Sequence, residues 1–403
     1  MDVLEGVKVL DFTRVMAGPY CTEVLADFGA DVIKIESLPD GDGGRQFGVD
    51  YIGDQTTVFL MWNRGKRSLA LDLRRPDALA AVHRLVEDAD VVVENYRPGV
   101  ADQIGIGYEQ LSAINPRLVY CSISAFGSSG PLASLPGTDP VVQAASGIMS
   151  VTGEPHGAPC MVGVPVADFT GAMLGVQGVL LALLARERTG RGQRVDVSML
   201  RGVLSMLTTR LASYWTAGAD PGPNGSAHST LVPYQVFETT TEPVMAGAWH
   251  EDSWRAFVKA VDRPELAADP RFASNVERQK HRDLLIPQMR EEFARRSADE
   301  WEQRFAATGG LFARVNTFSG ILEHPHVQQA GVVEMTEHPT VGPVKQMTPP
   351  IELSDTPGRL HRPAPLLGQH TAEILGEHGF SADAIAALIE AGTALDQSLP
   401  SAP

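Results

Sequence analysis

The alternation of short apolar runs with helix-like segments is the feature that most limits how this chain can fold. Residues 7–12 and 31–36 are rich in valine, isoleucine and leucine. The Gly18–Phe28 segment between them has a helical pattern that opens with proline and ends before glycine. Comparable helix–strand pairs follow at 76–95 and 108–123. This alternation is typical of parallel strands joined by helices, and it predicts an α/β fold with a doubly wound sheet.

The rest of the chain divides where its composition changes. A long apolar segment at 168–188 ends at glycine and predicts a helix. The Gly218–Ser229 segment is rich in Gly, Pro, Ser and Asn, which indicates a linker, and charged amphipathic helices follow between 246 and 320. We therefore expect a large domain at 1–217, a linker at 218–229, a small domain at 230–325, a return to the large domain at 326–403, and frayed residues at 398–403.

Charge and cysteine usage limit the partners of the chain. The 403 residues carry a formal net charge of -16, which repels nucleic acid and anionic membranes. The longest apolar stretch, Leu174–Ala185, is too short to span a bilayer. The three cysteines are far apart and form no Cys-x-x-Cys pair, and the first residues show no secretory pattern. We expect a cytoplasmic protein with no metal site and with neither nucleic acid nor membrane as a partner.

Several widespread catalytic and cofactor motifs are missing. The sequence has no Gly-x-Ser-x-Gly elbow, no phosphate-binding P-loop and no His-Glu-x-x-His. Glu36 ends the first strand–helix–strand unit where an NAD-binding fold would hold the ribose. The turn at 13–19 has one glycine where that fold needs several, so the sequence argues against NAD.

Four segments occur in an order that points to one family. They are Val9–Pro19 with Gly29–Glu36, Asn63–Leu73, Val93–Gly99, and Pro165–Asp168 with Arg186–Met199. Together they resemble the class III CoA transferases, a family related to the α-methylacyl-CoA racemases. The resemblance implies a Rossmann-like large domain, a smaller α+β domain and an interlocked homodimer. It also implies an acyl-CoA and a small carboxylic acid as substrates, with CoA as substrate and no tightly bound cofactor.

Asp168 is the residue that the resemblance identifies as catalytic. Its carboxylate would attack the thioester and form a mixed anhydride, which the released CoA thiolate converts into an aspartyl-CoA thioester. Asp168 directly precedes the apolar helical segment, so we expect it to be the N-cap. The positive helix end would then favour its ionised form.

The resemblance also places residues beside the nucleotide of CoA. Those residues are Val15, Met16, Ala17, Leu71, Arg74, Asn95, Tyr96 and Arg97. Lys66 and Arg67 are further candidates for phosphate contact. The family often has a basic residue where this chain has Ser37, Gln103 and Pro136. The grip on the phosphates would therefore depend more on Arg74 and Arg97.

Two other functions remain open at this stage. A racemase pairs a histidine with the catalytic aspartate, but Thr138 stands where that histidine is expected, in the run Gly137-Thr138-Asp139. We expect Asp139 only to organise a turn outside the site. A non-catalytic acyl-CoA binding protein is the second alternative, although it would have lost Asp168. The donor and acceptor acids, the acyl pocket, the oxyanion donors and the choice between inter- and intramolecular transfer stay open.

Overall fold

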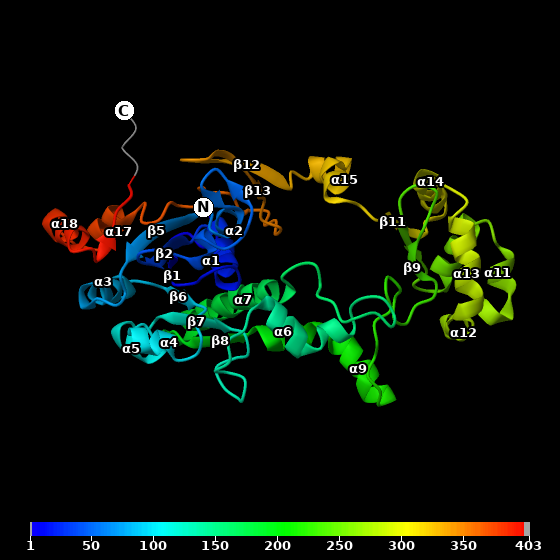
Figure 1. Cartoon of the computed structure of the whole chain (residues 1–403), viewed down its shortest axis with the longest axis horizontal. Coiled ribbons are helices and arrows are strands. Elements are labelled where there is room, and N and C mark those ends of the chain that lie inside the picture. The colour runs from blue at the N-terminus through cyan, green and yellow to red at the C-terminus, as the bar shows by residue number, and fades with distance from the viewer. Residues whose placement is uncertain (1, 399–403) are drawn as a thin grey trace. The chain divides into compact units, whose positions relative to one another are not determined.

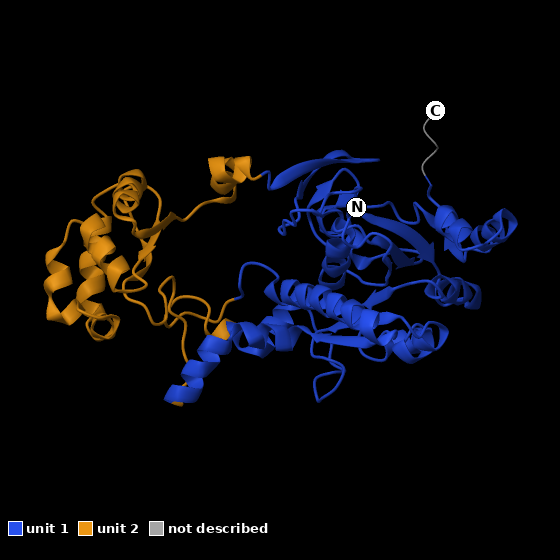
Figure 2. Cartoon of the chain, turned by 180° about the vertical axis from the view of Figure 1, so that it is seen from behind, with its two compact units in different colours: residues 1–148, 161–217, 331–403 blue, residues 149–160, 218–330 orange. Residues whose placement is uncertain are grey.

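The computed structural model describes residues 2–398, so the frayed end expected at 398–403 lies almost wholly outside the described residues. The chain forms two compact units (Figure 2). Unit 1 comprises residues 1–148, 161–217 and 331–403, and unit 2 comprises residues 149–160 and 218–330. Each unit is described by itself below.

Unit 1 is built on a seven-stranded sheet (Figure 1). The strand order is β14-β5-β2-β1-β6-β7-β8, and every neighbouring pair is parallel except β14 with β5. The predicted α/β fold with a parallel sheet is thereby confirmed. The strands are β1 (Lys8–Asp11), β2 (Asp31–Ser37), β5 (Lys66–Leu71), β6 (Val91–Glu94), β7 (Val119–Ser124), β8 (Arg194–Ser198) and β14 (Ala394–Leu395).

The direction in which strands are added reverses between β1 and β6. From β1 the chain adds β2 and then β5 on one side, and later β6, β7 and β8 on the other. The loops that leave β1 and β6 therefore diverge at the carboxyl edge of the sheet. Such a switch point is where open α/β sheets bind ligands.

The helices of unit 1 pack against this sheet or against one another. They are α1 (Ala17–Asp27), α2 (Thr57–Trp62), α3 (Pro76–Val86), α4 (Val100–Ile104), α5 (Tyr108–Ile114), α6 (Asp139–Ser146), α7 (Val166–Thr189), α8 (Met199–Met206), α9 (Thr208–Ala217), α17 (Thr371–Glu377) and α18 (Ala382–Glu390). Unit 1 also has the small ladders β3 (Tyr51–Ile52) with β4 (Gln55–Thr56) and β12 (Val333–His338) with β13 (Gly342–Met347).

Helix α7 lies close to α1 and β7 because glycines replace larger residues along one of its sides. A Cβ atom on Gly175 would come within 2.9 Å of the Cys21 sulfur and of Ile123. With 24 residues, α7 is long and apolar enough to cross a membrane by length and composition, so the expectation that this stretch is too short is wrong. One such helix is weak evidence for a membrane span, since the core helix of a soluble protein has the same properties.

Unit 2 combines a three-stranded antiparallel sheet with short helices. The sheet order is β11-β10-β9, and aromatic side chains such as Phe293 and Trp301 fill the core between sheet and helices. The elements are β9 (Tyr234–Phe237), β10 (Val244–Gly247), β11 (Leu311–Arg314), α10 (Glu251–Ala260), α11 (Glu265–Ala268), α12 (Asn275–Lys280), α13 (Arg282–Phe293), α14 (Ala298–Thr308), α15 (Phe318–Glu323) and α16 (Pro325–Gln329).

Candidate active site

A pocket of about 780 Å³ opens at the carboxyl ends of β1, β6 and β7, next to the switch point of the sheet. All of its lining residues belong to unit 1. It brings together most of the site residues expected from the sequence, and these come from three separate parts of the chain. These are Val15, Met16, Ala17, Asn95, Tyr96, Arg97 and Asp168.

Asp168 lies in the first turn of α7 and lines the pocket. Helix α7 begins at Val166, so the N-cap position belongs to Pro165, and the expectation that Asp168 is the cap is wrong. Burial and, to a smaller extent, the nearby Asp139 carboxylate together raise the pKa of Asp168 to about 7. The helix end therefore does not dominate its ionisation, contrary to what the sequence suggested. A carboxylate with so little hydration is a stronger nucleophile than one in water.

Asp139 supplies the cap that Asp168 does not. One of its carboxylate oxygens accepts hydrogen bonds from the backbone N–H groups of Ala167, at 2.6 Å, and Asp168, at 3.3 Å. The other accepts a bond from the side chain of Gln143 at 2.6 Å. Asp139 also lines the pocket, so placing it outside the site was wrong. Because Asp139 satisfies the start of α7, the Asp168 carboxylate receives no hydrogen bond from any residue that the structure describes.

The loop from β1 to α1 forms another wall of the pocket. Val15 has a φ of 68°, in the left-handed region that a β-branched residue rarely enters. The side chain of Asn95 bridges to the same loop, since it accepts from Arg14 N at 2.8 Å and donates to Arg14 O at 2.9 Å. The backbone N–H groups of Met16 and Ala17 stand at the start of α1, where a helix offers them no acceptor. They are candidates for binding an oxyanion in the pocket.

Arg14 is a site residue that the sequence reasoning missed. Its guanidinium lies over the ring of Tyr96, 5.0 Å from the centroid, and it donates to the Ser37 hydroxyl at 3.2 Å. Arg14 and Arg97 both line the pocket and are its cationic side chains. The signal in the sequence was the position of both residues at strand ends: Arg14 lies three residues after β1, Ser37 is the last residue of β2, and neighbouring parallel strands end side by side.

Four other candidates lie outside the pocket. Leu71 is fully buried in the sheet core, and its position lends no support to a nucleotide contact. Arg74 is exposed and forms an ion pair with Asp72. The candidates Lys66 and Arg67 are wrong, because buried Lys66 bonds to Asp11 and Pro19 O, and Arg67 is enclosed by three carboxylates, those of Asp31, Glu373 and Glu377.

The described lining of the pocket does not contain the histidine that a racemase would pair with the aspartate. Thr138 does line the pocket, but no histidine is among the described residues that do. The described part of the chain also contains no cluster of His, Cys, Asp and Glu that could hold a metal ion. The carboxyl groups among the described lining residues are those of Asp139, which caps α7, and Asp168.

Comparisons with known proteins agree with this geometry. The family model described as CoA-transferase family III matches residues 4–371. Human succinyl-CoA:glutarate CoA-transferase is 35% identical over 374 residues, which cover 93% of this chain and 85% of the human protein. Acetyl-CoA:oxalate CoA-transferase of Acetobacter aceti is 41% identical over 298 residues, or 74% of this chain and 76% of that protein.

A solved structure leads to the same class. A CAIB/BAIF family protein from Brucella suis superposes with a TM-score of 0.83 at 34% identity, covering 94% of this chain and 99% of that one. The family model and these relatives, on a fold of this class, identify an enzyme that transfers CoA between an acyl-CoA and a carboxylic acid. This chain belongs to CoA-transferase family III.

Proposed function

We propose that this chain transfers CoA from the thioester of one short dicarboxylic acid to another free dicarboxylic acid, with Asp168 as the nucleophile. The substrate class is suggested by the relatives, whose names include succinyl-CoA, glutarate and oxalate. The nucleophile is suggested by its place in the pocket. We take succinyl-CoA as the first donor to test, because it is named for the human relative.

The proposed reaction proceeds through covalent intermediates on Asp168. An oxygen of its carboxylate attacks the thioester carbonyl, the C–S bond breaks, and a mixed anhydride and CoA thiolate are left. The thiolate attacks the carbonyl carbon of Asp168, which forms aspartyl-CoA and releases the first acid as its carboxylate. The acceptor carboxylate then repeats both exchanges in reverse order and leaves as the new acyl-CoA.

The observation that carries this proposal is that the Asp168 carboxylate accepts no hydrogen bond from the residues that the structure describes. A carboxylate that accepted the hydrogen bonds of a helix start would be weakened as a nucleophile, but Asp139 accepts them instead. Asp168 is thus both desolvated and free to react. No observation favours the racemase, because Thr138 cannot return a proton at the opposite face of the α-carbon.

We further propose that the enzyme is a cytoplasmic homodimer with interlocked subunits. Apolar side chains that stand exposed on unit 1 support an interface, among them Leu181 (67% exposed) and Leu184 of α7 and Trp215 (70% exposed) of α9. Cys21, Cys121 and Cys160 are free thiols, as expected in a reducing compartment. Sedimentation equilibrium at several protein concentrations would test the dimer, and a monomer at micromolar concentration would contradict it.

A labelled-CoA exchange assay tests the proposed reaction. The enzyme is incubated with succinyl-CoA and a panel of free acids, and label in each new acyl-CoA is measured. We expect exchange with short dicarboxylic acids, and a loss of at least about a thousandfold in Asp168→Asn, because an amide cannot form the anhydride. Mass spectrometry of the wild type, quenched during turnover, should show CoA attached to the peptide that contains Asp168.

The control is Asp77→Asn, because Asp77 also stands in the first turn of a helix, α3, but outside the pocket. We expect this variant to keep wild-type exchange. Full exchange in Asp168→Asn would eliminate Asp168 as nucleophile. Exchange of the α-proton of a branched acyl-CoA with solvent, without any CoA exchange, would contradict the transferase proposal and favour a racemase.

A further inference from the structure

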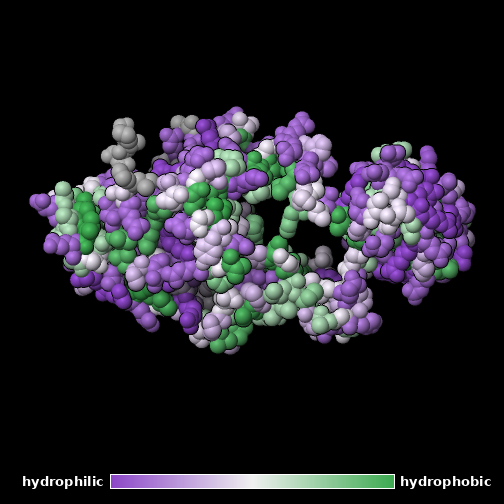
Figure 3. Space-filling view, turned by 45° about the horizontal axis from the view of Figure 1, so that its top comes forward, coloured by the Kyte–Doolittle hydropathy of each residue, from purple (hydrophilic) through white to green (hydrophobic). Residues whose placement is uncertain are grey.

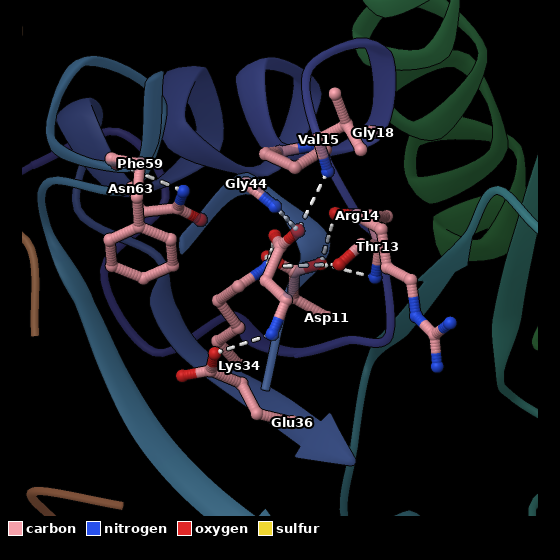
Figure 4. A network of polar contacts seen from close by, with 12 residues as sticks. Asp11, Thr13, Arg14, Val15, Gly18, Lys34, Glu36, Gly44, Phe59 and Asn63 are labelled. Atoms are coloured by element: carbon pink, nitrogen blue, oxygen red, sulfur yellow. Dashed lines mark hydrogen bonds and ion pairs between the residues drawn. The ribbon is translucent and has the colours of Figure 1, made fainter. Parts of the chain in front are cut away.

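A cluster of fully buried charges lies beneath the pocket wall formed by the β1–α1 loop. Asp11, Lys34 and Lys66 have no exposed surface. Lys66 Nζ donates to Asp11 at 2.9 Å, so Asp11 already has a cationic partner. Lys34 lies 4.0 Å from the same carboxylate and extends toward Asp11 and Thr13 (Figure 4). The charge of Asp11 therefore does not by itself explain why Lys34 is also buried here.

Lys34 and Asp42 together hold the backbone of the loop. Lys34 Nζ donates to Thr13 O at 2.9 Å and forms an ion pair with one carboxylate oxygen of Asp42 at 2.8 Å. The other Asp42 oxygen accepts from Val15 N and from Gly44 N, both at 2.8 Å. The side chains of this ion pair thus reach the loop on both sides of Arg14.

Val15 is the strained residue that these bonds restrain. A β-branched residue in the left-handed region is strained and persists only where its surroundings determine its conformation. Gly44 lies against it, since a Cβ on Gly44 would be 3.7 Å from the Val15 Cα. Two buried charges are also costly to keep, and apolar residues of similar size would often do as well for stability. Strain and buried charge coincide here at a wall of the pocket.

We propose that Lys34 and Asp42 are positioning residues for CoA binding. By drawing Val15 N toward Asp42, they hold Val15 in its left-handed conformation and thereby set where Met16 and Ala17 stand in the pocket. Asp42 also caps the turn at Gly43–Arg45, which leads to Phe47 at the pocket wall, so one carboxylate fixes two walls. The inference rests on the proposed function, because it concerns binding of the CoA substrate.

Calorimetric titration with CoA itself, rather than turnover, measures this effect. We expect Asp42→Ala to weaken CoA binding about tenfold, which corresponds to about 1.4 kcal/mol. The same substitution in the background of Val15→Gly should weaken binding less than about threefold. Glycine adopts a positive φ without strain, so the loop no longer depends on Asp42. This coupling would not be seen if Asp42 only stabilised the fold.

The matched control is Asp27→Ala. Asp27 ends helix α1 and forms a similarly buried ion pair with Arg64 at 2.7 Å, but neither residue lines the pocket. We expect this variant to lower the melting temperature as Asp42→Ala does, and to bind CoA as the wild type does. If Asp42→Ala does not fold, Asp42→Asn takes its place in the same cycle and should show the same coupling to Val15→Gly.

The outcomes separate this inference from the proposed function. A wild type that binds no CoA would contradict the proposed function. A wild type that binds CoA, with the folded Asp42 variant binding equally well, would overturn the positioning role alone. Equal weakening in the Val15 and Val15→Gly backgrounds would overturn it too, because the loss would then not pass through the strained loop.

Discussion

The two units of the chain each have an apolar core, but they bury charge to different extents. In unit 2, Phe293 is fully buried among aromatic rings, with centroids 4.4 Å from Phe237 and 4.5 Å from Trp301. In unit 1, fully buried charges such as Lys34 and Asp11 lie at the switch point of the sheet. On the face that Figure 3 shows, unit 2 is mostly hydrophilic, whereas unit 1 carries several hydrophobic patches.

The contrast shows where this protein keeps buried charges that stabilise it less than apolar packing would. Aromatic packing stabilises a core through buried area and ring geometry, and this stabilisation does not depend on pH. Buried charges are weak stabilisers, and sites that depart from the best packing tend to be functional. We infer that unit 1 accepts the cost of buried charge beside its pocket, whereas unit 2 buries few charged side chains, among them Arg278.

The largest expected effect is on the packing of unit 2. Phe293→Ala should lower the free energy of unfolding of this unit by about 3–5 kcal/mol, because it removes a ring from a filled core and leaves a cavity. Urea denaturation followed by hydrogen-exchange mass spectrometry assigns the loss to unit 2. The control Phe318→Ala truncates a phenylalanine of the same unit that is 88% exposed, and it should change stability by less than about 0.5 kcal/mol. Similar losses in both variants would refute the contrast.

The second effect is a pH dependence confined to unit 1. The pKa of Asp168 is raised to about 7 by burial and by Asp139, from 3.8. A raised pKa means that the folded state binds the proton more tightly than the unfolded state. The stability from this proton is fully present below pH 3.8 and is lost as pH rises through 7. Asp168→Asn should therefore be up to about 4 kcal/mol more stable than the wild type at pH 8 and gain almost nothing at pH 4.

Urea unfolding of both proteins across this pH range measures the difference, again resolved by hydrogen exchange. Asp77→Asn serves as control, and it should follow the wild type at every pH. In unit 2 the pKa values of Glu242, Glu251, Glu265, Asp269 and Glu277 are lowered, so ionisation of these carboxyl groups should take no stability from this unit between pH 4 and pH 8. An Asp168→Asn gain that is independent of pH would mean that burial does not perturb this carboxyl group.

Much of the fold followed from local patterns. The strands at 7–12 and 31–36 and the helix between them are confirmed as β1, β2 and α1, because a parallel sheet needs apolar strands and helical crossovers. The three strands of unit 2 are harder to find, because β10 and β11 have four residues each and pair across 63 intervening residues, Ala248–Gly310. Pairing at such separation leaves no local signal.

The site was predictable in its parts but not in its arrangement. Asp168 and the residues at 15–17 and 95–97 were expected, and the structure places them around one pocket. The role of Asp139 was misjudged, because its hydrogen bonds reach 28 and 29 residues along the chain to the start of α7. A helix whose cap comes from another element begins earlier than local capping rules suggest, here two residues before Asp168.

The smallest expected effects concern two arginines of unit 1, both of which the sequence analysis assigned to binding the phosphates of CoA. Arg97 lines the pocket, whereas Arg74 lies outside it with a side chain that is 78% exposed and paired with Asp72. Exposed ion pairs of this kind contribute about 0–1 kcal/mol. We expect Arg97→Ala to raise the Kd for CoA about tenfold and to reduce its dependence on salt, since the pocket loses a cationic side chain. Arg74→Ala should change the Kd less than about twofold. The reverse order of effects would mean that the phosphates of CoA lie beside the end of β5, outside the pocket described here.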